Sequence, residues 1–134
     1  MKGVDVSDAI LFVHTMKVPA AEMHDFTRAL QSAVEFVEAN GPHLMVEAYV
    51  DESRERAYSF QLYPDSASIR AHWEMSDPYI RDVMKHASVE RLDIYGHPDD
   101  SVMQHIRELS AAGVEVSVTP NLTGFHRLAP PAPD

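Results

Sequence analysis

Three strand-like segments of this chain carry apolar side chains on both of their faces, and this feature limits the available folds more than any other. In the segment at residues 9–18, Phe12 and Met16 lie on one face while Leu11 and Val13 lie on the other. Successive side chains of a β-strand point to opposite faces of its sheet. A sheet built from such strands needs cover on both sides, and the helices of one short chain cover only one.

The strands of this sheet are predicted from segments rich in branched and aromatic residues, at residues 9–18, 43–51, 56–63 and 89–95. The second and third segments are joined by the polar sequence Glu52-Ser53-Arg54-Glu55, which is typical of an antiparallel hairpin.

Two helices separate these strands. The first is predicted over residues 20–39, where apolar residues recur at helical spacing, and Asn40-Gly41-Pro42 ends it with a left-handed cap at Asn or Gly. The second begins at Asp65 or Ser66 and restarts at Pro78, because proline breaks a helix but suits its first turn. The order βαββαβ predicts an α+β fold, a ferredoxin-like sandwich with both helices on one face of the sheet.

An extension at residues 98–128 follows this core of residues 9–95. We expect a helix capped by Asp99 or Asp100, then a strand where Val114, Val116 and Val118 alternate with polar residues. Residues 121–128 are expected to form one more extended piece.

The composition indicates one globular domain at residues 1–128, followed by a flexible proline-rich tail at 129–134. No cysteine is present, which excludes disulfides and thiolate chemistry. A formal net charge of −10 argues against nucleic acid as a partner. No apolar run reaches the ~18 residues of a membrane span, and Asp5 and Asp8 interrupt any secretory signal, so we expect a cytoplasmic protein that does not bind membranes.

The second apolar face of the sheet predicts a homodimer, in which two identical chains pack these faces together. Stable pairs bury about 800 Å² on each partner. The alternative is that residues 98–128 cover this face within one chain.

The chain resembles the dimeric α+β barrel superfamily, specifically the antibiotic-biosynthesis-monooxygenase-like proteins, over about residues 9–95. The resemblance rests on LFVHTMKVPA in the first strand, on the helix ending at Asn40-Gly41-Pro42, and on SFQLYPDSASIRAHWEMSDPY. In the last segment, Ile69 and His72 match the family's hydrophobic residue followed three positions later by His. The superfamily includes cofactor-free oxygenases of quinols and polycyclic phenols, haem-degrading enzymes and lactone isomerases. The resemblance implies a dimeric barrel of this kind.

His72, Trp73 and His14 are the candidate catalytic residues. His72 and Trp73 follow the third strand on a helix, where a neutral imidazole takes a proton from a phenol and an indole stacks on its ring. His14, in the first strand, would be a second polar contact. The structural alternative is that the helix packs its aromatic residues into the core and that Gln61, Tyr49 or the backbone satisfies a buried His14.

Tyr49, Tyr58 and Gln61 are the candidate substrate-binding residues, because each can donate a hydrogen bond to a substrate hydroxyl; the alternative role is in the sheet or an interface. The eight histidines lack the His-x3-His and His-Glu-x-x-His spacings, so no metal site is expected. The remaining polar-face or element-end histidines are expected to be solvated, namely His24, His43, His97, His105 and His126.

The function that these residues favour is oxygenation of a small aromatic phenol or quinol without metal, flavin or other cofactor. One alternative is a non-catalytic ligand-binding or regulatory dimer that uses the same cavity. Another is a lactone or ring isomerase, which would also move a proton through a histidine or carboxylate.

Overall fold

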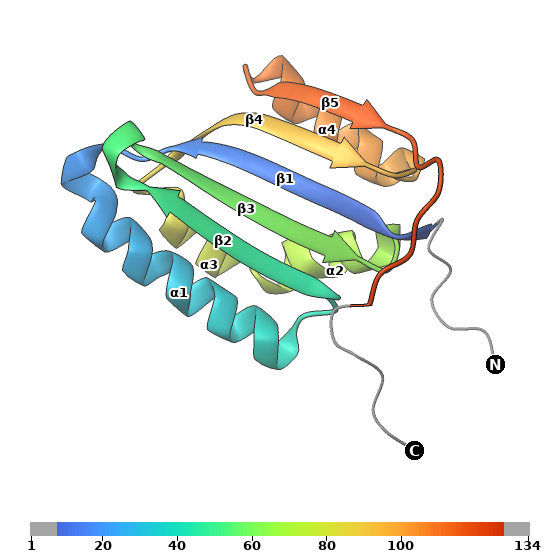
Figure 1. Ribbon diagram of the computed structural model, residues 1–134, viewed down its shortest axis with the longest axis horizontal. Helices are drawn as coiled ribbons and strands as arrows, with labels where there is room; N and C mark the ends of the chain where they lie inside the picture. The colour runs from blue at the N-terminus through green and yellow to red at the C-terminus, as the bar shows by residue number, and fades with distance from the viewer. Residues whose placement is uncertain (1–7, 128–134) are drawn as a thin grey trace.

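The protein folds into a mixed five-stranded sheet that is covered by helices on one face (Figure 1). The structure is a computed structural model, and it describes residues 8–127. The strands lie in the order β2-β3-β1-β4-β5. Their bounds are β1 (Ile10–Lys17), β2 (Met45–Asp51), β3 (Arg56–Tyr63), β4 (Ser88–Tyr95) and β5 (Glu115–Thr119). The first four strands pair antiparallel and β5 pairs parallel to β4. The predicted ferredoxin-like α+β class is confirmed.

Four α-helices lie on the other side of the sheet from the viewer in Figure 1. They are α1 (Met23–Asn40), α2 (Ser66–Met75), α3 (Asp77–Val83) and α4 (Asp100–Ala111), and a short 3-10 turn, η2 (Ala20–Glu22), precedes α1. Asp65 caps α2 and Asp99 caps α4, each by accepting a hydrogen bond from a backbone N–H of the first turn. No helix within residues 8–127 combines the length and apolar character that a membrane crossing requires.

Two local predictions were wrong, at the start of β2 and at the end of α1. β2 begins at Met45, because residues 43 and 44 still belong to the loop after α1. Gly41 ends α1 in an extended conformation (φ −84°, ψ 160°) and not in a left-handed one. Residues 121–127 form no strand, and residue 128 together with the predicted tail at 129–134 lies outside the described residues.

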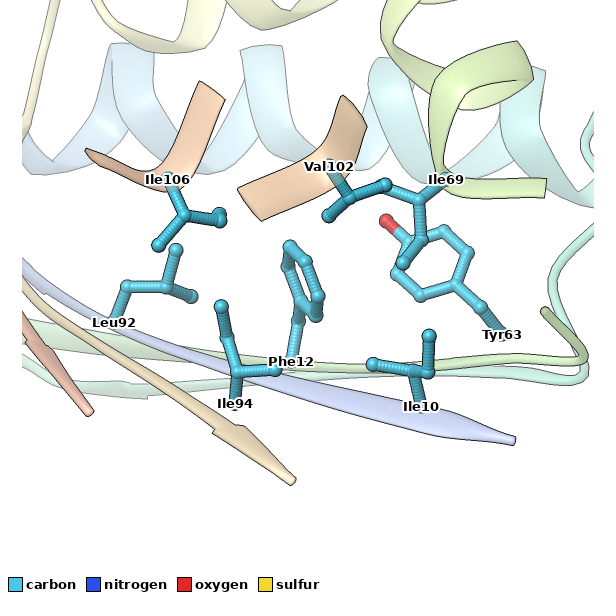
Figure 2. Packing of buried hydrophobic residues seen from close by; sticks show 8 residues of the cluster. All are labelled: Ile10, Phe12, Tyr63, Ile69, Leu92, Ile94, Val102 and Ile106. Atoms are coloured by element: carbon cyan, nitrogen blue, oxygen red, sulfur yellow. The ribbon is translucent and has the colours of Figure 1, made fainter. Parts of the chain in front are cut away.

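The hydrophobic core consists of two separate clusters, both on the helix-covered face. Figure 2 shows the first, in which Phe12 of β1 points toward Val102 of α4 and Tyr63 of β3 lies beside Ile69 of α2. The second cluster packs the other end of β1 against α1 and α3 through Met16, Phe26 and Val83. His14 lies between Phe12 and Met16 on β1, so a polar side chain occupies the gap between the two clusters.

The opposite face of the sheet is uncovered in the described part of the chain. Tyr49 is 55% exposed and Tyr95 is 45% exposed on it. The extension does not cover this face, since β5 lengthens the sheet beside β4 and α4 packs on the helix-covered side (Figure 1). The β4–β5 half of the open face is polar, because Arg91 is paired with Asp93 and Glu115. The alternative in which the extension covers the open face is therefore wrong for residues 8–127.

Candidate functional site: a histidine-lined cavity

A cavity of about 380 Å³ lies between the sheet and the four helices, in the gap between the two core clusters. The β1 and β3 residues His14 and Ser59, which are Cα partners in the sheet, both line it. Where the cavity borders the first cluster its wall is polar, with His43, Gln61, Tyr63 and His72. Where it borders the second cluster the wall is apolar. The apolar residues include Met16, Leu30, Ala33, Val83 and Val89. Such a space suits a small molecule with an apolar body and a polar end.

His72 reaches the cavity from α2 and is only 8% exposed. It shares one helix face with Ile69 and Ser76, since residues three and four positions apart lie together on a helix. Its Nδ1 lies 2.9 Å from Ser76 Oγ, and its ring packs edge-on against His43 with 4.4 Å between centroids. Burial, and then the proximity of His43 and His14, lower the pKa of His72 to about 4. The imidazole is therefore neutral at pH 7.

His43 belongs to the site although the sequence suggested a solvated residue. Its Nε2 lies 3.2 Å from Gln61 Oε1, which also accepts a hydrogen bond from Tyr63 Oη at 2.5 Å. An amide oxygen only accepts hydrogen bonds, so His43 carries its proton on Nε2. Burial lowers the pKa of His43, and the bond to Gln61 partly opposes this. The predicted hairpin brings the start of the segment at residues 43–51 beside the end of the segment at 56–63, and this was the signal that could have identified it.

Gly41 allows His43 to take this position. A Cβ at Gly41 would lie 3.0 Å from His43 Nδ1 and 2.9 Å from Val37 Cγ1. Both contacts are closer than carbon and nitrogen atoms normally approach, so the turn between α1 and β2 requires a residue without a side chain here.

His14 is the member of the group without a protein partner. Neither ring nitrogen forms a hydrogen bond with another described residue, and Nδ1 has no accessible surface. The expected partners are unavailable, because Gln61 bonds to His43, Tyr63 and Ser59 and Tyr49 lies on the other face of the sheet. Burial lowers the pKa of His14 to about 4. The interior therefore presents a neutral and unpaired imidazole to the cavity.

Trp73 lines the cavity and packs against His105 of α4, with 4.2 Å between ring centroids and an angle of 40° between the ring planes. His105, predicted to be solvated, keeps an exposed edge but forms part of the cavity wall. An ion pair between Arg70 and Asp99, and a hydrogen bond of 2.9 Å from the Asp99 N–H to Ser66 Oγ, join α4 to α2. The extension thus completes the site.

The structure separates Tyr49 and Tyr58 from this cavity. Both lie on the open face of the sheet, in a hollow that they line with Met45, Glu47 and Phe60. Gln61 faces the cavity instead. The sequence prediction that grouped all three as substrate contacts of one cavity is therefore corrected, because alternate residues of a strand face opposite sides.

Among residues 8–127, one group of side chains has ligand atoms close enough to hold a metal ion, and it comprises Glu22, Asp25 and His86. None of the three lines the cavity. His86 Nδ1 lies 2.6 Å from Glu22 Oε2, which accounts for these two side chains as a hydrogen-bonded pair.

Comparison with known proteins identifies the fold. No family model and no curated protein matches the chain. Among solved structures, MupZ from Pseudomonas fluorescens has a TM-score of 0.72 at 13% identity, covering 93% of this chain and 99% of that one. SnoaB, a cofactor-independent oxygenase from Streptomyces nogalater, has a TM-score of 0.56 at 12% identity, covering 69% and 95%. A proposed antibiotic biosynthesis monooxygenase from Caulobacter crescentus has a TM-score of 0.59 at 15% identity, covering 69% and 92%.

These likenesses show that the chain shares the fold of SnoaB and of the Caulobacter protein. The match to MupZ leaves less than a tenth of this chain uncovered and so extends into α4 and β5. The extension that supplies His105 is thus present in at least one structure of this fold.

Proposed function

We propose that this protein is a small monooxygenase that oxygenates an aromatic phenol or quinol in the cavity without metal, flavin or other cofactor. The observation that carries the proposal is the convergence of three neutral histidines on one largely apolar cavity, with His14 left unpaired. The cofactor-independent oxygenase SnoaB has the same fold, which supports this kind of chemistry here.

The reaction uses the substrate as its own reductant. A neutral imidazole takes the hydroxyl proton of the phenol, and the electron-rich phenolate passes an electron to O₂. A C–O bond then forms, the O–O bond breaks, and one oxygen atom leaves as water. A phenol with a free ring position and one O₂ give one quinone and one water, so atoms and electrons balance. Residues of this chain bind and orient the ring and move the proton.

The lining of the cavity suits a neutral aromatic substrate. No lysine or arginine is among its lining residues, so no fixed positive charge favours a carboxylate or phosphate ligand. Trp73 offers an aromatic face, and the aliphatic residues of α1 and α3 offer apolar contact to the rest of the molecule.

Oxygen consumption with a panel of hydroquinones and naphthols tests this function. We expect uptake of one O₂ for each quinone formed, insensitive to chelators, and loss of most of the rate in His72→Ala. The exposed variant His97→Ala is the matched control. If phenols raise the thermal stability of the protein but are not converted, the protein binds such ligands without catalysis and the proposal is wrong. Conversion without oxygen consumption would indicate an isomerase.

We also propose that the protein is a homodimer that buries the open face of the sheet. The β1–β3–β2 half of that face carries Val13, Phe60 and Leu62 together with the exposed Tyr49. A second copy would cover this surface by a two-fold symmetric contact.

A further inference from the structure

The three histidines of the cavity differ in what holds each ring, and this difference assigns them different roles. His43 has its proton fixed on Nε2, because that atom faces Gln61 Oε1. Its Nδ1 is buried beside Gly41 and has no accessible surface. His43 therefore exposes neither a free acceptor nor a free donor to a ligand.

His72 is held as a hydrogen-bond donor. Ser76 is 1% exposed, and the hydrogen bond to His72 Nδ1 is the one that its hydroxyl forms with the described residues. If Ser76 only accepted in that bond, its own buried O–H would lack an acceptor, which is costly. Ser76 therefore donates to Nδ1, and the neutral ring of His72 carries its proton on Nε2. That nitrogen forms no hydrogen bond with residues 8–127 and keeps accessible surface.

His14 is free to accept a proton. Its Nδ1 has no accessible surface, whereas its Nε2 is accessible and forms no hydrogen bond with a described residue. No described neighbour fixes its tautomer, so the ring can present a bare Nε2 to the cavity without breaking a hydrogen bond to a described residue. Of the three histidines, only this ring can take a proton from a ligand without first losing a protein contact.

We propose that His14 Nε2 takes the proton of an acidic hydroxyl on the ligand while His72 Nε2–H donates to a second oxygen of the same ligand. The ligand class is then a phenol or enol that also carries a carbonyl or second hydroxyl oxygen, with its apolar body toward α1 and α3. In this step the ligand O–H bond breaks, an N–H bond forms at Nε2, and a phenolate–imidazolium pair results. The inference rests on the proposed function for its substrate, but its test requires no oxygenation.

The pair of charges is feasible in this cavity. Burial lowers the pKa of His14 to about 4, which disfavours the imidazolium in the empty site. An anion about 4 Å away, at an effective dielectric constant of about 20, shifts a protonation equilibrium roughly a thousandfold in the opposite direction. This attraction is large enough to offset the burial. The other titratable groups that line the cavity are His43, Tyr63, His72, Asp77 and His105.

A chromogenic nitrophenol tests this assignment, because its phenolate absorbs at longer wavelength than its neutral form and its electron-poor ring resists oxidation. Trp73 is the sole tryptophan of the chain and lines the cavity, so quenching of its fluorescence measures binding independently of the charge state. Titrations are carried out at a pH below the probe's own pKa, where the free probe is neutral.

We expect the wild-type protein to quench and to show the phenolate band. His14→Gln should still quench but lose the band, because an amide does not accept a proton. His72→Gln should keep the band and bind more weakly. His97→Gln, an exposed histidine outside the cavity, should behave as wild type, and circular dichroism should show that all variants are folded.

The assignment is overturned if His14→Gln keeps a full phenolate band, if the band is lost in His72→Gln alone, or if the wild-type protein binds the probe only as the neutral phenol or not at all. His14→Asn provides a second variant should His14→Gln fail to fold. The wild-type protein could show a phenolate band that the His14 variant loses, and yet consume no oxygen with any phenol. That result would support the roles assigned to His14 and His72 and contradict the proposed monooxygenase function. The two failures are thus distinguishable.

Discussion

His14 of the central strand β1 and Ser59 of the neighbouring strand β3 are Cα partners, and together they occupy the position where the hydrophobic core divides into two clusters. An apolar pair at this position would join the clusters and fill the space between them. The cavity exists because the chain places an imidazole and a small hydroxyl side chain there. The same pair provides its polar floor.

The buried histidines make the stability of the fold depend on pH. Burial lowers the pKa of His14 to about 4 in the folded protein, against 6.5 for an ordinary histidine. The unfolded chain therefore binds more protons between these values. The free energy of unfolding is greatest above pH 6.5 and falls as the pH drops toward 4, by about 3 kcal/mol for His14.

Urea denaturation at pH 7 and pH 4.5 measures this effect. His14→Gln removes the titrating group, so its loss of stability between the two pH values should be smaller than that of wild type by about 2 kcal/mol. Carboxylates such as Asp93, whose pKa is lowered mainly by its hydrogen bond to Arg91, contribute equally in both proteins. Equal losses in wild type and variant would show that His14 is not held neutral.

Gly41→Ala should disturb the site through the backbone. The new Cβ would meet Val37 Cγ1 and the Val37 carbonyl oxygen, each at 2.9 Å, as well as His43 Nδ1 at 3.0 Å. We expect a loss of about 1–3 kcal/mol in the free energy of unfolding, as for other overpacked positions, and weaker phenol binding because His43 is displaced. Chemical denaturation measures the first effect and Trp73 fluorescence the second. Glu38→Ala, exposed near the same helix end, should change neither, and a fully stable Gly41→Ala protein would contradict the described turn.

His105 should act on ligand binding through its tilted ring contact with Trp73. Its replacement by alanine removes the aromatic contact, while phenylalanine keeps it. Aromatic pairs of this kind contribute about 0.5–1.5 kcal/mol. We therefore expect His105→Ala to weaken phenol binding by about two- to tenfold and His105→Phe to restore it, as measured by fluorescence titration. Equal weakening in both variants would mean that the imidazole acts by hydrogen bonding and not by stacking.

The open face predicts the oligomeric state. Wild-type protein should sediment with twice the mass of one chain at micromolar concentration. Phe60→Glu places a charge in the hollow beside Tyr49 and Tyr58 and should give single chains. Thr119→Glu, exposed on β5 at the polar margin, should remain dimeric. A wild-type protein that sediments with the mass of one chain would contradict the proposed homodimer.

Much of the fold follows from local patterns in the sequence. Asp65 and Asp99 cap helices where capping residues were expected, and the helix interruption before Pro78 was expected as well. The order of strands and helices sufficed for the ferredoxin-like topology. The left-handed cap at Gly41 was wrong because Pro42 follows it, and a residue before proline is biased toward an extended backbone.

The site was less predictable, because it depends on contacts between distant segments. His72, Trp73 and His14 do converge on one cavity. His105 enters it only because α4 packs on the helix-covered face, which no pattern in residues 98–128 indicates. The misplacement of Tyr58 was avoidable, since Tyr58 and Gln61 are an odd number of residues apart on one strand and must face opposite sides.

Labelling with ¹⁸O₂ tests the central claim most directly. The protein is incubated under ¹⁸O₂ with 1-naphthol and its tricyclic hydroxylated analogues, in the presence of a chelator, and the quinones are analysed by mass spectrometry. Oxygenation by the histidine-lined cavity predicts one ¹⁸O atom in each product quinone, with formation abolished in a protein that lacks both His14 and His72. Quinones without ¹⁸O, or equal labelling in the doubly substituted protein, would contradict it.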